Sequence, residues 1–403
     1  MTAMLTVEEA QQRVLDEVRV LDDEQVALID ARNRVLREDV AAPHDLPQGD
    51  NSAMDGYALR AEDAPGELRV IEDVAAGHNP KLRIERGTAS RIMTGALIPD
   101  GADAVAQIEI TDGGREVVRI NESVERGANI RKRGDDMREG EIILRNGTPI
   151  HAAEIGVLAS VGRTHVRVGR QPTIAILATG DEIVEIDRTP AFGQVANSNS
   201  YALAALAQEA GAKAKICGIV RDDLDATIAA IDSSLDCDFI VSSGGVSVGA
   251  YDFVKDALDA LGAETKFWKV SMKPGKPVVL ARVRERLYFG LPGNPVSSMV
   301  AFILFVAPSI RKATGQTSNV FAPTISMAVT APLRSKGDRR AYLRVRVIAR
   351  DGVLVAEPMR AQGSHISTSM LGANGFAIVE TGTTRFNEND LVPVLLIGPP
   401  FAE

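Results

Sequence analysis

The sequence predicts a multidomain α/β and β protein whose centre is a doubly wound, mostly parallel α/β domain. Between residues 173 and 315, short apolar strands alternate with amphipathic helices, which is the pattern of a parallel sheet covered by helices. Residues 66–138 and 318–403 instead contain short strands separated by turns, the pattern of β-rich domains. The length of 403 residues suits about two to four domains.

Composition and charge exclude several classes of function. With 45% hydrophobic and 25% charged residues, the chain has the composition of a soluble globular protein. A net charge of −9 and only 4% aromatic residues disfavour nucleic acid as the main partner. The sequence contains no run of about 18 apolar residues, so no membrane span is expected. The acidic N-terminal stretch does not have the pattern of a secretory signal. Two cysteines, Cys217 and Cys237, lie in predicted strands, which fits core packing in a reducing cytoplasm.

The N-terminal part is expected to be helical over residues 6–36, because TVEEAQQRVLDEV and DEQVALIDARNRVL both place apolar residues three and four positions apart. Prolines and glycines in 41–60 then end this pattern. Residues 142–172 are expected to return through an apolar helix and a short strand. The predicted domains are a discontinuous helical and β N-terminal domain (1–44 plus 139–170), a β-rich insertion (45–138), the α/β domain (171–317) and a small C-terminal β-barrel (318–403).

In the α/β domain the strands TIAILAT, KICGIV and CDFIVSS alternate with the helices NSYALAALAQEAGA and DDLDATIAAIDSSL. The helix FVKDALDALG, the strands FWKV, PVVLARV and RLYFGLP, and the long apolar helix PVSSMVAFILFVAPSIRKATG complete it. Because ligands of such sheets bind beyond the carboxyl ends of the strands, the polar residues that follow the strands predict a cleft at that edge. These are residues 179–182, 221–223, 244–249 and 293–295.

The glycine-rich loop SSGGVSVG (242–249) is the strongest local signal at this edge. Glycines allow backbone N–H groups to approach an anion closely, and the helix that follows adds a favourable dipole. The loop matches neither the dinucleotide-binding pattern GxGxxG nor the P-loop pattern GxxxxGK[ST]. An anion site and a plain tight turn are therefore both open.

A lysine-rich segment follows in FWKVSMKPGKP, where Lys269, Lys273 and Lys276 fall within eight residues. The prolines make a solvated helical face impossible and fix the directions of the side chains. A lysine cluster over the glycine-rich loop would neutralise a ligand that carries several negative charges. The alternative is a basic surface turn.

The carboxylates Glu182, Asp222 and Asp252 lie at or just beyond strand ends. Such hard oxygen ligands suit Mg²⁺, which uses one or two carboxylates together with phosphates and water. The alternative is helix capping, since Asp222 and Asp223 precede a helix. We expect Asp223 to be the cap, and both interpretations stay open for Asp222.

Outside the α/β domain, Asp55 lies in a glycine-flanked turn and Thr94 directly follows a strand. The C-terminal domain contains a basic segment (Lys336, Arg339, Arg340, Arg344 and Arg346) and the hydroxyl-rich GSHISTS (363–369). Basic and hydroxyl groups together suit an oxyanion such as phosphate or molybdate, although a solvated face is the default for each arginine taken singly.

These segments occur in a fixed order that identifies a family. NSAMDGYA, RIMTGA with IPDGADAV, NIRKRGDD, ATGDE, GIVRDD, SSGGVSVGAYDF, FWKVSMKPGKP, LPGNPVS and QGSH follow one another over about 310 residues. The chain closely resembles the MoeA family, the molybdopterin molybdenumtransferases, which is related to the gephyrin E domain. The resemblance covers essentially the whole chain.

The resemblance implies four domains in an elongated homodimer, in which the molybdopterin-binding α/β domain faces the second and fourth domains of the partner subunit. It implies that adenylyl-molybdopterin and molybdate bind with Mg²⁺, that the phosphoanhydride is cleaved and AMP released, and that molybdenum stays bound by the dithiolene. We expect no nucleic acid and no membrane as partners; other proteins of molybdenum cofactor biosynthesis are further partners that this function allows.

Carried over by motif, Asp55, Thr94 and Asp136 come from the second domain, and Arg344 and Ser364 from the fourth, with Arg340 or Arg346 as alternatives to Arg344. Lys269 and Lys273 would contact the phosphates or molybdate. The expected catalytic residues are Asp55, Thr94, Asp252, Lys269 and Lys273, and the expected metal ligands are Glu182, Asp222 and Asp252. The expected ligand-binding residues are Gly180, Asp181, Gly244, Gly245, Ser247, Gly249, Lys276, Gly293, Asn294, Pro295, Arg344 and Ser364.

Three alternatives remain beside this function. The first is the preceding adenylylation step, whose single-domain enzyme would lack the long segments found here on both sides of the α/β domain. The second is a gephyrin-like scaffold, which would need an appended linker and partner domain. The third is a tungstate-specific relative, because tungstate and molybdate have nearly the same size and charge. No Ser-His-Asp or Cys-His constellation suggests a covalent enzyme intermediate, and the order of metal insertion and anhydride cleavage is open.

Overall fold

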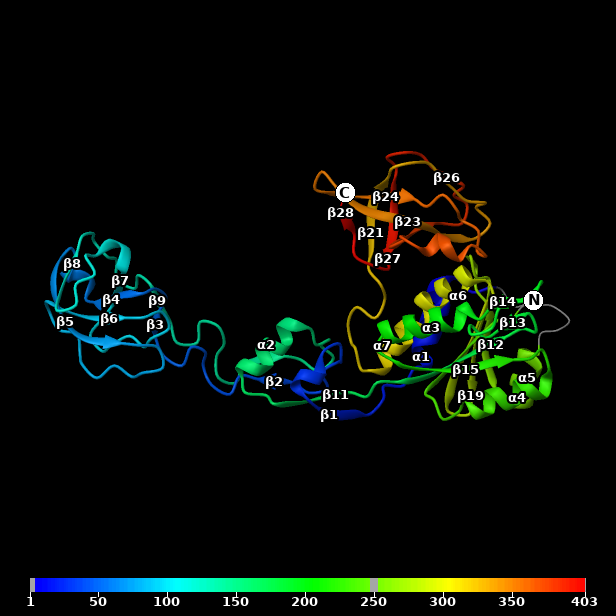
Figure 1. Ribbon diagram of the computed structural model, residues 1–403, viewed down its shortest axis with the longest axis horizontal. Coiled ribbons are helices and arrows are strands. Elements are labelled where there is room, and N and C mark those ends of the chain that lie inside the picture. The colour runs from blue at the N-terminus through cyan, green and yellow to red at the C-terminus, as the bar shows by residue number, and fades with distance from the viewer. Residues whose placement is uncertain (1–3, 247–252, 403) are drawn as a thin grey trace. The chain divides into compact units, whose positions relative to one another are not determined.

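The computed structural model describes residues 4–246 and 253–402 (Figure 1). The chain forms two compact units. Unit 2 consists of residues 39–145 and 157–162, and unit 1 of the rest of the chain. Unit 1 contains the α/β domain and the C-terminal barrel, and the division into four domains with the boundaries given above stays a prediction.

The N-terminal helix α1 (Val7–Glu17) begins with a capping box. The Thr6 hydroxyl accepts from the Glu9 N–H, and the Glu9 carboxylate accepts from the Thr6 N–H at 2.8 Å, so two N–H groups of the first turn are satisfied. The helix buries Val7, Ala10 and Val14. The predicted helix over TVEEAQQRVLDEV is thus present.

The second predicted N-terminal helix, over DEQVALIDARNRVL, is wrong. Its first part is strand β1 (Asp23–Ala27), which pairs antiparallel with β11 (His165–Gly169), and a short 3₁₀ turn (Leu28–Ala31) follows. Pairing with a strand about 140 residues away satisfies the backbone, and such tertiary pairing overrides a local three-to-four spacing. The positive φ of Asn33, 62°, then turns the chain.

The α/β domain contains a six-stranded sheet in the order β15-β12-β16-β20-β19-β17. The first four strands of this order are parallel, and β19 runs antiparallel to both β20 and β17. This is the mostly parallel sheet that the sequence predicts. The strands are β12 (Thr173–Thr179), β15 (Lys213–Val220), β16 (Phe239–Ser243), β17 (Glu264–Lys269), β19 (Pro277–Val283) and β20 (Arg286–Leu291).

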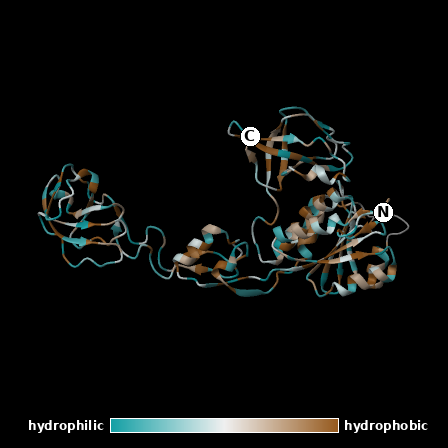
Figure 2. Cartoon of the chain, in the orientation of Figure 1, coloured by the Kyte–Doolittle hydropathy of each residue, from teal (hydrophilic) through white to brown (hydrophobic). Residues whose placement is uncertain are grey.

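Helices cover both faces of this sheet, so it is doubly wound. On one face α1, α3, α6 and α7 pack on side chains such as Ile174, Val241 and Phe289. On the other face α4 and α5 pack on Leu177, Ile240 and neighbouring side chains, and hydrophobic residues are frequent in the strands and helices of this domain (Figure 2). The helices are α3 (Ser198–Glu209), α4 (Leu224–Ser233), α5 (Val254–Ala260), α6 (Pro295–Ala301) and α7 (Ala307–Ala313).

The long apolar helix predicted from PVSSMVAFILFVAPSIRKATG is interrupted by a π-helical turn, Phe302–Val306, between α6 and α7. Pro308 lies in the first turn of α7. Because proline has no N–H and its ring clashes with the carbonyl one turn earlier, the helix widens instead of continuing regularly. Pro295–Ala313 is apolar and long enough to cross a membrane, but 78% of its most apolar window is buried inside the protein, as in a core helix.

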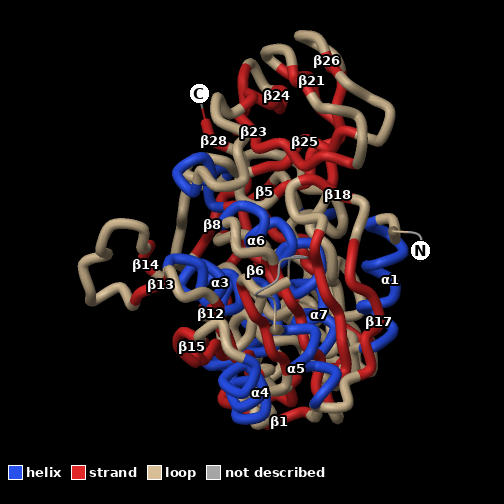
Figure 3. The backbone as a smooth tube through the Cα atoms, turned by 90° about the vertical axis from the view of Figure 1, so that its right-hand side faces the viewer, coloured by secondary structure: helices blue, strands red, loops and turns tan. Residues whose placement is uncertain are grey.

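A small two-stranded parallel ladder, β13 (Ile183–Val184) with β14 (Val195–Ala196), follows β12 directly. Its loop projects from the side of unit 1 (Figure 3) and exposes Phe192 fully.

The C-terminal segment of unit 1 is a closed β-barrel, as predicted. The strands β23-β24-β21-β27-β25 form a sheet that closes on itself, because β25 also pairs with β23. The short strand β18 (Met272–Lys273) from the α/β domain adds to β23 in parallel register. The remaining strands are β21 (Thr324–Val329), β22 (Leu333–Arg334), β23 (Arg340–Arg350), β24 (Val353–Pro358), β25 (Gly375–Val379), β26 (Arg385–Phe386), β27 (Leu391–Leu396) and β28 (Phe401–Ala402).

Unit 2 is built on a five-stranded sheet in the order β7-β4-β6-β5-β8, with Tyr57, Leu59 and Ile120 in its core. Two short ladders, β2 with β10 and β3 with β9, complete it, so this part of the chain is β-rich as expected. The elements are β2 (Val40–Ala41), β3 (Asn51–Ser52), β4 (Gly56–Leu59), β5 (Gly66–Val74), β6 (Thr88–Ile92), β7 (Ala104–Gln107), β8 (Val117–Ile120), β9 (Ile130–Arg131) and β10 (Ile142–Leu144). The boundary between the two units falls within helix α2 (Ala152–Ser160).

Candidate functional site

The loops after four parallel strands meet at one edge of the six-stranded sheet. Strand β12 lies between β15 and β16. After β12 the chain forms β15 on one side of it and then crosses to form β16 on the other side. Such a switch point opens a crevice beyond the strand ends. Backbone hydrogen bonds tie the loops together: the Gly180 N–H donates to the Val220 carbonyl at 3.3 Å and the Gly244 N–H to the Leu291 carbonyl at 3.0 Å. The predicted convergence of these loops is therefore present.

Glycines allow the closest of these approaches. Gly244 and Gly245 have φ values of +101° and +66°, which L-residues with side chains rarely adopt. A Cβ on Gly244 would lie 2.6 Å from the Thr179 carbonyl oxygen, and one on Gly245 would lie 2.9 Å from the Thr179 Oγ1. Close packing between loops thus explains these two glycines without excluding an anion. The predicted residues Ser247 and Gly249 lie outside the residues that the structure describes.

Asn199 joins the loops through its side chain, and the sequence analysis did not predict this. It lies in the first turn of α3, which Asn197 caps by accepting from the Ser200 N–H. The Asn199 Nδ2 donates to the Ser243 Oγ at 2.9 Å and to the Gly293 carbonyl at 2.7 Å. The only local signal was an amide just after a helix start, which does not reveal a contact with residues 44 and 94 positions away.

Acidic residues form a corner beside the switch point. The Asp222 N–H donates to the Asp181 carboxylate at 3.3 Å. Burial raises the pKa of Asp222, and the negative charges of Asp181 and Glu182 raise it further. Among the described residues, none of these three carboxylates forms an ion pair with a lysine or arginine. Asp223 instead caps α4 by accepting from the Ala226 N–H at 2.8 Å, as expected.

Carboxylate oxygens such as those of this corner are the ligand type that Mg²⁺ prefers. Within residues 4–246 and 253–402, no three acidic, histidine or cysteine side chains lie close enough together to hold a metal ion. The third predicted ligand, Asp252, lies outside these ranges. The ligand set Glu182, Asp222 and Asp252 therefore stays a prediction.

The lysine-rich segment lies against the loop that precedes α6. A Cβ on Gly275 would come within 3.4 Å of the Ser297 carbonyl oxygen and 4.0 Å of the Pro292 ring. Lys269 ends β17, and Lys273 lies in β18 and pairs with Ala341 of the barrel. In the described part of the chain, Lys269, Lys273 and Lys276 form no salt bridge, and Lys273 lies near enough to Asp338 for its charge to help lower the pKa of Asp338.

The barrel reaches the same edge through Ser364. Its hydroxyl accepts from the Asn294 Nδ2 at 3.2 Å, and its carbonyl accepts from the Val296 N–H at 3.1 Å. Because Asn294 and Pro295 begin α6, the predicted residues 293–295 and Ser364 lie together. The sequence pattern had suggested only that both bind ligand.

The three candidate arginines of the barrel differ in their surroundings. Arg340 forms ion pairs with Glu8 and Glu380, and Arg346 lies 4.8 Å from the centre of the Phe401 ring. Arg344 is only 1% exposed, and burial lowers its pKa. Its Nη2 donates to the carbonyls of residues 361 and 363 at 3.1 and 3.3 Å. A direct contact between Arg344 and a ligand stays a prediction.

Unit 2 carries a second group of predicted residues. The Thr94 N–H and hydroxyl both donate to Asp55 Oδ1, at 2.7 and 2.8 Å. These two hydrogen bonds lower the pKa of Asp55, so this exposed carboxylate is held ionised and in one direction. Asp136 is exposed, and its N–H donates to the Leu46 carbonyl.

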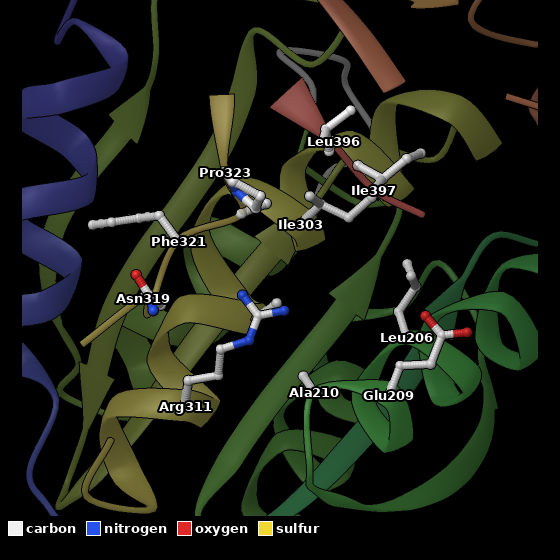
Figure 4. A pocket seen from close by; sticks show the side chains of 12 residues that line it. Leu206, Glu209, Ala210, Ile303, Arg311, Asn319, Phe321, Pro323, Leu396 and Ile397 are labelled. Carbon is white, nitrogen blue, oxygen red and sulfur yellow. The ribbon is translucent and has the colours of Figure 1, made fainter. Parts of the chain in front are cut away.

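A cavity of about 540 Å³ lies elsewhere in unit 1 (Figure 4). Leu206, Ile303, Arg311, Phe321 and Ile397 line it together with neighbouring residues, and none of the predicted site residues does. Its lining comes from the C-terminal half of α3, the π-helical turn and later residues, whereas the strand-end loops contact the first turns of α3 and α6. The cavity is therefore separate from the strand-end loops.

Comparison of the sequence with protein families gives three matches in order. Residues 5–162 match the MoeA N-terminal region (domain I and II), residues 175–312 match a probable molybdopterin binding domain, and residues 327–397 match the MoeA C-terminal region (domain IV). Together they cover most of the chain.

Individual relatives agree with these matches. The molybdopterin molybdenumtransferase of Bacillus subtilis is 35% identical over 406 residues, covering 98% of this chain and 94% of its own length. Molybdopterin molybdenumtransferase 2 of Mycobacterium tuberculosis is 37% identical over 385 residues, covering 92% and 94%. The crystal structure of the molybdopterin biosynthesis moeA protein from Pyrococcus horikoshii superposes with a TM-score of 0.84 at 27% identity, covering 98% of this chain and all of that one.

Proposed function

Because this chain belongs to the MoeA family and is a transferase of molybdenum cofactor biosynthesis, we propose that its strand-end loops bind adenylyl-molybdopterin and molybdate in the presence of Mg²⁺. The enzyme inserts molybdate into the dithiolene and releases AMP. The observation that supports this most is that four strand-end loops, including the acidic corner, lie at one edge of the six-stranded sheet, the edge at which β17 also ends with Lys269.

The chemistry follows from charge. The phosphates of the substrate and the incoming molybdate are all anions and repel one another. Lys269 and Lys273 hold them together, and their charges stabilise the negative charge that develops on the leaving phosphate. Lys276, which is exposed, adds to the positive potential at the entrance. Two orders of reaction fit this arrangement. A molybdate oxygen attacks phosphorus, or the metal is inserted before the anhydride is cleaved.

Glu182, Asp222 and Asp252 are the proposed ligands of Mg²⁺. When bound there, the ion neutralises charge and polarises a phosphoryl oxygen. Gly180, Asp181, Gly244 and Gly245 lie beside it, and Ser247 and Gly249 are further proposed ligand-binding residues. Asn294, Pro295 and Ser364 complete the opposite wall.

We further propose that the enzyme is a cytoplasmic homodimer with its sites between subunits. In this arrangement Asp55, Thr94 and Asp136 of one subunit complete the site at the strand-end loops of the other. The support is the resemblance together with Asp55, whose carboxylate is ionised, oriented and exposed but has no partner in an ion pair among the described residues.

The test is release of AMP from adenylyl-molybdopterin by the purified full-length protein, with molybdate and Mg²⁺ each present or omitted. We expect release that requires both, together with transfer of molybdenum to the dithiolene. Formation of adenylyl-molybdopterin from ATP and molybdopterin, without molybdate-dependent release, would instead indicate the preceding step. Tungstate in place of molybdate measures which oxyanion is preferred.

A further inference from the structure

The side-chain amide of Gln362 binds the backbone of β23 as a neighbouring strand would. Its Oε1 accepts from the Arg344 N–H at 3.0 Å, and its Nε2 donates to the carbonyls of Arg344 and Met359, each at 2.9 Å. Three of the four hydrogen bonds that an amide side chain can form are thus directed at two backbone segments. A half-buried glutamine that is satisfied in this way holds the segment 359–363 in one conformation.

Arg344 holds the same segment from the other side. Its buried guanidinium donates to the carbonyls of Ala361 and Gly363, and no acidic residue is among the causes that set its pKa. Both the backbone and the side chain of Arg344 therefore bind residues 359–363. We call Gln362 and Arg344, with these hydrogen bonds, the barrel clamp.

The barrel clamp ends next to the strand-end loops. Ser364 directly follows the clamped segment, and its hydroxyl and carbonyl bind the Asn294 side chain and the Val296 N–H. The preceding Gly293 carbonyl accepts from Asn199, which also binds Ser243. A continuous set of hydrogen bonds therefore leads from β23 of the barrel through Ser364 to the loops after β20 and β16.

We propose that Gln362 is a positioning residue of the transfer reaction: it fixes Ser364 against the first turn of α6 and so sets the geometry of the strand-end loops. It does this without contacting the ligand. This inference rests on the proposed function for its kinetic consequence, whereas its structural consequence can be measured without substrate.

The structural arm is hydrogen–deuterium exchange of the intact protein without ligand. Gln362→Met removes the hydrogen bonds and keeps the length of the side chain. We expect residues 294–298 to exchange at least tenfold faster in Gln362→Met, because the Val296 N–H loses a fixed acceptor. Exchange in this segment that equals the wild type would overturn the proposal.

Asn374, which directly precedes β25, supplies a control because its side chain also binds the backbone of β23. Its amide also binds a β23 backbone, accepting from the Val347 N–H at 2.6 Å and donating to the Val347 carbonyl at 3.0 Å, but its further contact is with Pro399. It does not lead to Ser364. We expect Asn374→Ala to lower the melting temperature while the exchange of residues 294–298 and kcat/KM for AMP release stay as in the wild type. If destabilising the barrel were enough to affect the site, Asn374→Ala would change the melting temperature, the exchange of residues 294–298 and kcat/KM together.

The kinetic arm is a double-mutant cycle of Gln362→Met and Ser364→Ala. We expect Gln362→Met to lower kcat at least tenfold with little change in KM, and the double variant to lose much less than the product of the two single losses, because both act through one contact. Independent, multiplicative losses would overturn the positioning role. A wild type that releases no AMP would refute the proposed function, and the exchange measurement would still decide on the barrel clamp.

Discussion

At the acidic corner, burial and the negative charges of neighbouring carboxylates change the pKa of a single residue, Asp222. Asp181, Glu182 and Asp222 lie together without an ion-pair partner among the described residues, and the pKa of Asp222 is raised by its burial and by its two neighbours. An ionised carboxylate in such a place destabilises the folded protein. A bound divalent cation would reverse that effect.

We therefore expect Asp222→Asn to stabilise the protein at pH 7 in the absence of Mg²⁺, by about 1–2 °C in melting temperature. The sign follows from the raised pKa. In the wild type, the folded state binds the Asp222 proton more tightly than the unfolded state does, so the wild type loses stability as pH rises through the folded pKa of Asp222. Below the unfolded pKa, Asp222 is protonated in both states, and the wild type and Asp222→Asn should be equally stable. Thermal melts at pH 3.5 and pH 7 measure this (roughly the two sides of an ordinary carboxyl pKa).

The same melts with Mg²⁺ provide the control. Mg²⁺ should raise the melting temperature of the wild type more than that of Asp222→Asn. An equal increase in both proteins would show that Asp222 is not a ligand.

At the scale of elements, hydrogen bonds between strand starts and helix starts hold the α/β domain in register. Asp238, which precedes β16 and is 8% exposed, accepts two hydrogen bonds from Arg170 at 2.9 and 2.8 Å and two from Thr173 at 2.8 and 2.9 Å. Burial alone would raise the pKa of Asp238, but these donors outweigh it and the pKa is lowered. The carboxylate thus connects the starts of β12 and β16.

We expect Asp238→Asn to lower the free energy of unfolding by about 1–2 kcal/mol at pH 7, because the buried carboxylate loses its charge in the hydrogen bonds that it accepts from Thr173 and from Arg170, whose side chain is 38% exposed. Since the folded pKa is depressed, this stability is present above the unfolded pKa of about 3.9 and is lost as pH falls through the folded pKa. Urea unfolding at pH 7 and pH 3 should show a difference between variant and wild type that shrinks at low pH. A difference independent of pH would indicate a packing effect.

The hydrogen bonds of Asn199 connect α3 to the loops after β16 and β20. We expect Asn199→Ala to lower AMP release at least tenfold while costing about 1–2 kcal/mol of stability, the usual effect of losing two partly buried hydrogen bonds. Ser200→Ala, whose buried hydroxyl has no partner among the described residues, is the control and should keep full activity. Activity loss in both variants would point to damage to the helix instead of the loops.

The elements also show what a sequence pattern can establish. The alternation of strands and helices from 173 to 315 correctly predicts the doubly wound sheet, because strands buried on both faces must be continuously apolar. The spacing in DEQVALIDARNRVL predicts a helix and is wrong, because the pairing of β1 with β11 is set by residues about 140 positions away. The sequence does not predict the roles of Asn199 and Gln362 for the same reason, because these roles depend on side-chain contacts with residues far away in the chain.

At the scale of the whole molecule, the ordered motifs predict the family, and the strand-end positions predict the edge at which the site lies. They do not distinguish the buried Arg344 from the paired Arg340, because both occur in one basic strand. They also do not show which predicted residues act within one chain and which act across two.

Subunit complementation tests whether Asp55 and Lys273 act in one site from the same chain or from two chains. Asp55→Asn and Lys273→Ala should each be nearly inactive as pure proteins. If sites lie between subunits, unfolding and refolding an equal mixture should restore about a quarter of wild-type AMP release, because half of the dimers are mixed and each mixed dimer has one intact site. A mixture as inactive as its components, with mixed dimers present by mass spectrometry, would place both residues in a site of one chain.

The proposed reaction requires the lysines at the strand-end loops to bring the anionic substrates together. Its most direct test is AMP release by Lys273→Ala and Asp252→Ala compared with Lys213→Ala, which removes an exposed lysine at the opposite end of β15. We predict that the first two variants release no AMP while remaining folded and dimeric, and that Lys213→Ala is as active as the wild type. Wild-type turnover in both Lys273→Ala and Asp252→Ala would contradict the assignment of the site.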